Sequence, residues 1–177
     1  MKKFLWSLFG VGALLVGAQV AYTATDSQLF TVTVPKRVTI TKPVAAVAAT
    51  LPNSSASLAF PNQAWQVQGN VTNGVGVTFV VQQPFTNTTI GTYKRDAGLS
   101  VAVASTSGPA TWSVAGTGSA RTNYSAAVPV NTATVSASSN KVGQATFNVG
   151  VSFLTVDIAQ VATGDYVTTV VGTVTEN

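Results

Sequence analysis

The fold class of this chain is decided by residues 145–153, Ala145-Thr146-Phe147-Asn148-Val149-Gly150-Val151-Ser152-Phe153. Apolar residues alternate here with small or polar ones, and a two-residue period is typical of a strand with one buried face. The stretch is rich in valine and phenylalanine, which strands favour because β-branched and aromatic side chains pack well on a pleated surface. It therefore predicts a β-strand that contributes Phe147 and Phe153 to a core.

The same alternation recurs along most of the chain from Gln28 onward, and turn-forming residues separate the stretches. No part of this region shows a helical period. The pattern predicts about nine strands in an all-β fold, a single antiparallel two-sheet β-sandwich of the immunoglobulin-like or jelly-roll-like kind. The alternating stretches are 29–34, which breaks at Pro35 and resumes at 38–41, and then 64–68, 75–82, 99–103, 110–114, 126–130, 133–137, 145–153 and 166–175.

Turn signals and aromatic residues predict how the strands connect. The Asn73-Gly74 pair favours a hairpin, because both residues tolerate the positive φ of a tight turn, and this hairpin would place Trp65 opposite Phe79. Residues 43–57 and 84–97 lack alternation and are expected to be connections. The expected core consists of large apolar residues within the strands: Trp65, Phe79, Leu99, Trp112, Phe147, Phe153 and Tyr166.

Residues 1–21 fit a secretory signal peptide, because Lys2 and Lys3 precede an apolar run that ends in small residues. We place the cleavage site between residues 18 and 24, so that residues 22–177 form the mature single domain. An uncleaved membrane anchor is the alternative, since residues 4–24 could span a bilayer, but glycine and polar residues interrupt this stretch. The expected location is therefore secreted, extracellular or at the cell surface, with no membrane association after signal removal.

Side chains that catalyse reactions are scarce, since the chain has no histidine, no cysteine and five acidic residues. Nucleophilic, acid–base and metal catalysis depend on these residue types. We therefore expect no enzyme activity, no catalytic residues, no cofactor and no metal site. Removing the two signal lysines leaves seven basic residues against five acidic ones, a net charge of +2, and such a small surplus argues against a nucleic-acid partner.

Two polar connections carry the residues that could contact a ligand, namely Tyr93, Lys94 and Arg95 in one and Tyr124 in the other. An exposed tyrosine offers an aromatic face and a hydroxyl group. These residues would suit a monomeric secreted binding module for polysaccharide or a surface receptor, with loops 84–96 and 116–125 as its contact surface. A small outer-membrane barrel is a third alternative, since alternation and glycine also suit that class.

The two ends of the chain carry a resemblance to a known class of protein. Near the C-terminus, Gly164-Asp165-Tyr166 leads into an alternating, threonine-rich stretch, and Phe30-Thr31-Val32-Thr33-Val34 alternates in the same way. These ends resemble the last strand and the amino-terminal strand of secreted bacterial pilin and spore-coat-type β-sandwich subunits. The chain differs from the commonest pilins in lacking their disulfide.

The resemblance implies assembly by strand addition, in which residues 28–34 complete the sheet of a neighbour and Phe30, Val32 and Val34 fill its groove. The leading hypothesis is thus an exported, non-enzymatic structural subunit of a bacterial surface fibre, appendage or layer. Its expected partners are copies of itself or other surface proteins. The alternative for residues 28–34 is that they form the first strand of their own sandwich.

Overall fold

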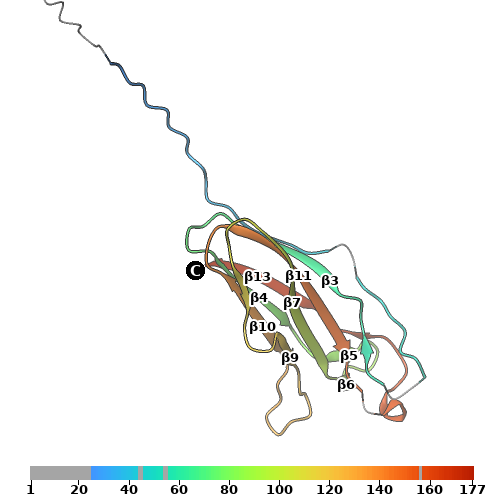
Figure 1. The fold of residues 1–177 in the computed structure, drawn as a ribbon. Helices are drawn as coiled ribbons and strands as arrows, with labels where there is room; N and C mark the ends of the chain where they lie inside the picture. The colour runs from blue at the N-terminus through green and yellow to red at the C-terminus, as the bar shows by residue number, and fades with distance from the viewer. Residues whose placement is uncertain (1–24, 44–45, 54–55, 156) are drawn as a thin grey trace, which may run out of the picture. The chain divides into compact units, whose positions relative to one another are not determined.

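The computed structural model describes residues 25–43, 46–53, 56–155 and 157–177. The predicted signal peptide and its cleavage window lie in residues 1–24, outside the described residues. The chain divides into two units, one ending at Val34 and the other spanning Pro35–Asn177, and Figure 1 draws both.

The first unit has no strand in its described part, residues 25–34. The expectation that residues 29–34 form a strand of their own sandwich is therefore wrong, whereas residues 38–41, which follow the break at Pro35, do form one. Alternation supplies the two faces of a strand, but a strand also needs a neighbour that pairs its backbone N–H and C=O groups.

The second unit is all-β, as predicted, and its described residues form thirteen strands rather than nine. The extra strands are mostly two or three residues long, too short for a period to be visible. Within the described residues the one helical element is the 3₁₀ turn η1 (Ile158–Gln160), and no helix is long and apolar enough to cross a membrane. The strands are β1 (Val38–Thr41), β2 (Leu58–Ala59), β3 (Gln63–Gly69), β4 (Val75–Val81), β5 (Phe85–Asn87), β6 (Lys94–Arg95), β7 (Ala97–Ser107), β8 (Trp112–Val114), β9 (Ser119–Arg121), β10 (Ala133–Ser139), β11 (Gly143–Phe153), β12 (Tyr166–Val167) and β13 (Val170–Glu176).

These strands form three antiparallel sheets. A six-stranded sheet has the order β1-β3-β11-β7-β9, with β2 also paired to β11, and a four-stranded sheet has the order β13-β4-β10-β8. A small third sheet has the order β12-β5-β6. The two larger sheets share one hydrophobic core, to which both contribute alternate side chains.

Aromatic side chains join the two larger sheets across this core. Trp65 of β3 meets Phe79 of β4 edge-on, with ring centroids 5.6 Å apart, and Phe147 of β11 lies 5.5 Å from both Phe79 and Trp112. Such tilted aromatic pairs add about 0.5–1.5 kcal/mol each beyond their burial. The predicted core is confirmed: Phe79, Leu99, Trp112, Phe147 and Phe153 are buried, and Trp65 and Tyr166 are partly buried.

The hairpin predicted at Asn73-Gly74 is wrong, because β3 and β4 belong to different sheets. A turn is present, with Gly74 at φ +80° and its N–H bonded to Val71 O at 3.0 Å. A Cβ on Gly74 would lie 2.2 Å from Ser139 O, so glycine is needed both for φ and for space. The turn carries the chain from one sheet to the other, which explains why Trp65 still faces Phe79.

Three further expectations need correction. Residues 126–130 contain no strand but one bridge between Asn123 and Val130, since Pro129 lacks the N–H that a ladder needs. The connection 84–97 contains β5 and β6, and the stretch 166–175 divides into β12 and β13.

Candidate functional site

The described part of the N-terminal segment (residues 25–34) exposes its apolar side chains. The predicted donor residues Phe30, Val32 and Val34 are 81%, 85% and 73% exposed, and Leu29 is 89% exposed. Burying one such side chain is worth about 1.5–3 kcal/mol, and a run of exposed apolar residues marks an interaction site. The segment therefore has the residues of a strand without the sheet that would bury them.

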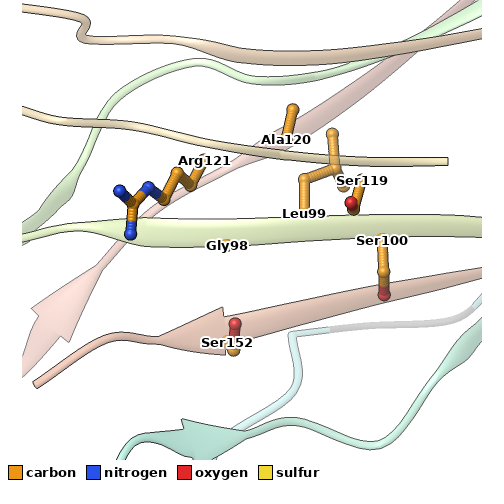
Figure 2. A pocket seen from close by; sticks show the side chains of 7 residues that line it. All are labelled: Gly98, Leu99, Ser100, Ser119, Ala120, Arg121 and Ser152. Carbon is orange, nitrogen blue, oxygen red and sulfur yellow. The ribbon is translucent and has the colours of Figure 1, made fainter. Parts of the chain in front are cut away.

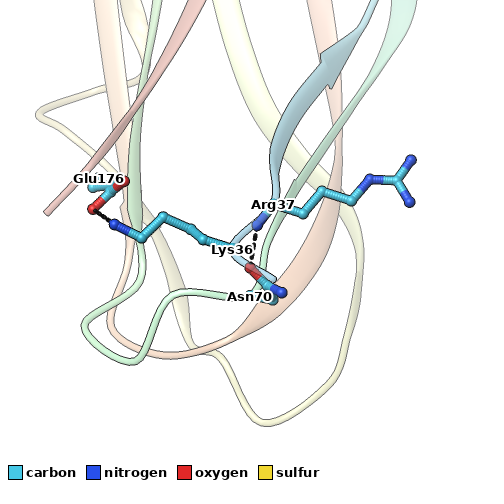
Figure 3. A network of polar contacts seen from close by, with 4 residues as sticks. All are labelled: Lys36, Arg37, Asn70 and Glu176. Carbon is cyan, nitrogen blue, oxygen red and sulfur yellow. Dashed lines mark hydrogen bonds and ion pairs between the residues drawn. The ribbon is translucent and has the colours of Figure 1, made fainter. Parts of the chain in front are cut away.

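The chain enters the β-sandwich at Pro35–Arg37, and polar contacts fix this entry beside the end of β13 (Figure 3). Lys36 Nζ lies 2.7 Å from Glu176 Oε2. The Asn70 side chain accepts a hydrogen bond from Arg37 N–H at 2.5 Å and donates one to Pro35 O at 2.8 Å. These contacts anchor the residues that immediately follow the N-terminal segment.

Strand β13 forms an open edge of the four-stranded sheet, because it pairs with β4 alone. Gln82 N–H donates to Thr169 O at 3.0 Å, and Asn177 N–H donates to Gly74 O at 3.3 Å. Antiparallel ladders alternate, so the backbone groups of the even-numbered residues of β13 point away from β4. Among the described residues, none forms a hydrogen bond with these groups.

Among the strands that end the described sheets, β13 is the longest and the least protected. Lysine, arginine and proline commonly block edge strands against pairing with another chain. β13 spans seven residues and contains none of the three. By contrast, β9 has three residues and ends in Arg121, β8 has three residues, and the four-residue β1 is flanked by a Lys-Arg pair and a Lys-Pro pair.

The side of the sandwich next to this edge is apolar and only partly covered. Val170 and Val174 of β13 are partly buried against the core, as are Ile40 of β1 and Trp65 of β3. A Cβ on Gly172 would lie 2.7 Å from Ile40 Cδ1 and 2.8 Å from Trp65 Cζ3, so these side chains close tightly over the middle of β13. We call this partly covered region between β1 and β13 the edge seam.

The predicted loop contacts lie elsewhere, around β6. Arg95 donates a hydrogen bond to the Tyr124 hydroxyl at 3.2 Å, so the structure brings these two residues together. Both line a hollow of about 510 Å³, which Tyr93 and Lys94 do not line. Tyr93 is 44% exposed and Lys94 is half-buried in β6.

Sequence reasoning does not single out Arg121, although Arg121 lies within the predicted contact loop 116–125. It predicts no ligand contact for the lining residues outside the two loops, which are Ser57, Leu154, Thr155, Asp157 and Gln160. Asp157 lies at the start of η1, where its carboxylate accepts a hydrogen bond from Ala159 N–H at 2.9 Å. In the described part of the chain, no group of three or more acidic side chains is placed to hold a metal ion. No signal in the sequence links residues that are so far apart along the chain.

Comparisons of the chain with protein-family models, with curated proteins and with solved structures give no match.

Proposed function

We propose that the protein is an exported, non-enzymatic structural subunit of a bacterial surface fibre, appendage or layer, which assembles by strand addition. Residues 28–34 of one copy pair with the β13 edge of the next. One observation carries this proposal: the same chain has an alternating segment outside any sheet and an unprotected edge of equal length, seven residues. Backbone hydrogen bonds along such an edge provide affinity, and alternate side chains provide specificity.

The side chains of the two partners suit this arrangement. Phe30, Val32 and Val34 are spaced two residues apart, so they would all lie on one face of an added strand. That face would cover the edge seam, where Trp65 and Ile40 are partly buried. The contact joins different surfaces of the two copies, and a head-to-tail contact of this kind produces a filament when it does not close into a ring.

The composition supports a role in a dense assembly. Charged residues make up 8% of the chain, against roughly a quarter in typical globular proteins. Neighbouring copies of such a protein repel one another weakly at short range. The expected signal peptide would deliver the protein to the compartment where a surface assembly forms.

Electron microscopy and analytical ultracentrifugation of the mature chain test this proposal. We expect concentration-dependent filaments, and we expect Val32→Asp to abolish them because a charge would enter the edge seam. Thr33→Asp is the matched control, since residue 33 lies on the opposite face of the added strand and should leave assembly intact. Both variants should keep the circular dichroism and melting temperature of the parent chain.

A peptide experiment then locates the contact without relying on filament growth. A synthetic peptide of residues 26–36 is added to the Val32→Asp chain, which serves as a soluble acceptor. We expect slower amide hydrogen exchange at the even-numbered residues of β13, such as Gly172 and Val174, because their N–H groups face the open edge. A chain that remains monomeric at high concentration, together with unchanged exchange in β13, would contradict strand addition.

A further inference from the structure

The hollow near Arg95 is assembled from four separate parts of the chain, and polar groups dominate its lining. Its volume of about 510 Å³ falls within the range of ligand sites, roughly 300–1,000 Å³. The residues with charged, amide or phenolic groups are Arg95, Asp96, Arg121, Tyr124, Asp157 and Gln160.

A buried hydrogen-bond frame holds one wall of the hollow in place. Thr122 is fully buried, accepts a hydrogen bond from Ala97 N–H at 2.9 Å and donates one to Asp96 Oδ1 at 2.9 Å. The same carboxylate oxygen accepts from Tyr124 N–H at 2.9 Å. Asp96 Oδ2 has no hydrogen bond within the described chain, so this rigidly held oxygen is free to accept one from a ligand.

The two arginines of the hollow lack anionic partners. The one ion pair in the described part of the chain joins Lys36 and Glu176, so neither guanidinium has a carboxylate within 4.0 Å. Arg95 donates to Lys94 O and to Tyr124, whereas the Arg121 guanidinium makes no hydrogen bond to any described residue. A guanidinium presents paired N–H groups that match a carboxylate.

Arg121 also lines a second hollow, of about 420 Å³, on the face of the six-stranded sheet (Figure 2). In this hollow Gly98 pairs across the ladder with Arg121 on one side and with Ser152 on the other. A Cβ on Gly98 would lie 2.3 Å from Ser152 Oγ, so the absence of a side chain leaves room for that hydroxyl. Ser100 and Ser119 pair with each other two residues farther along the same two strands, and they supply two more hydroxyls to this hollow.

We propose that these two hollows, which meet at Arg121, form one groove that binds an extended saccharide carrying carboxylates, such as a uronic-acid oligosaccharide. Arg121 would bind a carboxylate through its paired N–H groups. Sugar hydroxyls would bond to the serines on one side, and to Asp96 Oδ2 and the Gln160 amide on the other. Asp96 and Asp157 would repel a chain with several negative charges per sugar, which favours a uronic acid over a heavily sulfated polymer.

This groove does not depend on strand addition, because it involves β7, β9 and β11 whereas the proposed acceptor β13 belongs to the other large sheet. The test is isothermal titration calorimetry of the mature Val32→Asp chain, which keeps the groove and should remain monomeric. The probes are hexamers of galacturonic, glucuronic and mannuronic acid, together with the same hexamers after reduction of each carboxylate to a primary alcohol.

We expect at least one acidic hexamer to bind, and its reduced form to bind at least tenfold more weakly. Arg121→Gln should weaken binding of the acidic hexamer tenfold or more and leave the affinity for the reduced hexamer unchanged. Lys141→Gln is the control, because Lys141 lies at an exposed turn outside the groove, and it should change neither affinity. Failure of all three hexamers to bind, equal affinity for a reduced hexamer, or equal affinity for a single uronic acid or inorganic phosphate would overturn the proposal. Circular dichroism checks that each variant is folded.

Discussion

Residues 28–34 and strand β13 have the same kind of sequence in opposite environments. Both are seven residues long, and both contain the alternating stretch Thr-Val-Thr, at residues 31–33 and 173–175. Val170 and Val174 of β13 lie against the core on one side of the strand, whereas Val32 is 85% exposed and residues 28–34 form no strand. Alternation therefore encodes the capacity to form a strand, and the partner that completes the strand comes from elsewhere.

The difference between the two regions lies in what surrounds them. β13 follows β12 and returns beside β4, with which it pairs over its whole length. Residues 28–34 precede Pro35, which has no N–H to donate and fixes its own φ. The anchoring of Pro35–Arg37 by Asn70 and Glu176 begins directly after them. The sandwich thus has an open edge, and the unpaired segment ends where the sandwich begins.

The largest expected effect comes from placing the same charge in both regions. Val174→Asp should lower the free energy of unfolding by about 2–4 kcal/mol, because a carboxylate would replace a side chain packed against the core. Val32→Asp should leave the free energy of unfolding of the monomer unchanged within about 0.5 kcal/mol. Urea unfolding at low protein concentration measures both values, and equal destabilisation by the two substitutions would show that residue 32 is buried in its own domain.

A smaller effect is expected from filling the middle of β13. Gly172→Val should destabilise the sandwich by about 1–3 kcal/mol, because its Cβ would overlap Ile40 and Trp65, which lie less than 3 Å away. Thr173→Val is the control, since residue 173 faces outward and its substitution should change stability by less than about 0.5 kcal/mol. Thermal unfolding compares the two variants, and a fully stable Gly172→Val chain would mean that the edge seam opens readily.

The sequence predicts the fold class and much of the core because both depend on alternation and on large apolar side chains. Phe79 and Phe147 are identified from their strands alone, and both are fully buried. The prediction of a hairpin at Asn73-Gly74 is wrong, because a turn signal indicates that the chain reverses direction. It does not indicate that the next strand joins the same sheet.

The candidate sites are less visible in the sequence. Arg95 and Tyr124 are identified as polar loop residues, and the structure joins them. Arg121 lies in the predicted loop 116–125 but is not singled out there, because its place in the hollow depends on strand pairing: Gly98 pairs with Arg121 on one side and with Ser152 on the other. The open edge of β13 is likewise a property of strand order, which alternation does not specify.

The smallest effect is expected at the ion pair next to the edge. Lys36→Met should change the free energy of unfolding by less than about 0.5 kcal/mol, because the two side chains are 62% and 45% exposed and water screens their attraction. Asn70→Ala should cost more, about 1 kcal/mol, since it removes two hydrogen bonds to the backbone of residues 35–37. Urea unfolding at low and high salt measures both variants. The opposite result would be a larger loss of unfolding free energy for Lys36→Met than for Asn70→Ala, with the difference disappearing at high salt. It would mean that the ion pair, and not the hydrogen bonds to the backbone, holds residues 35–37 at the end of β13.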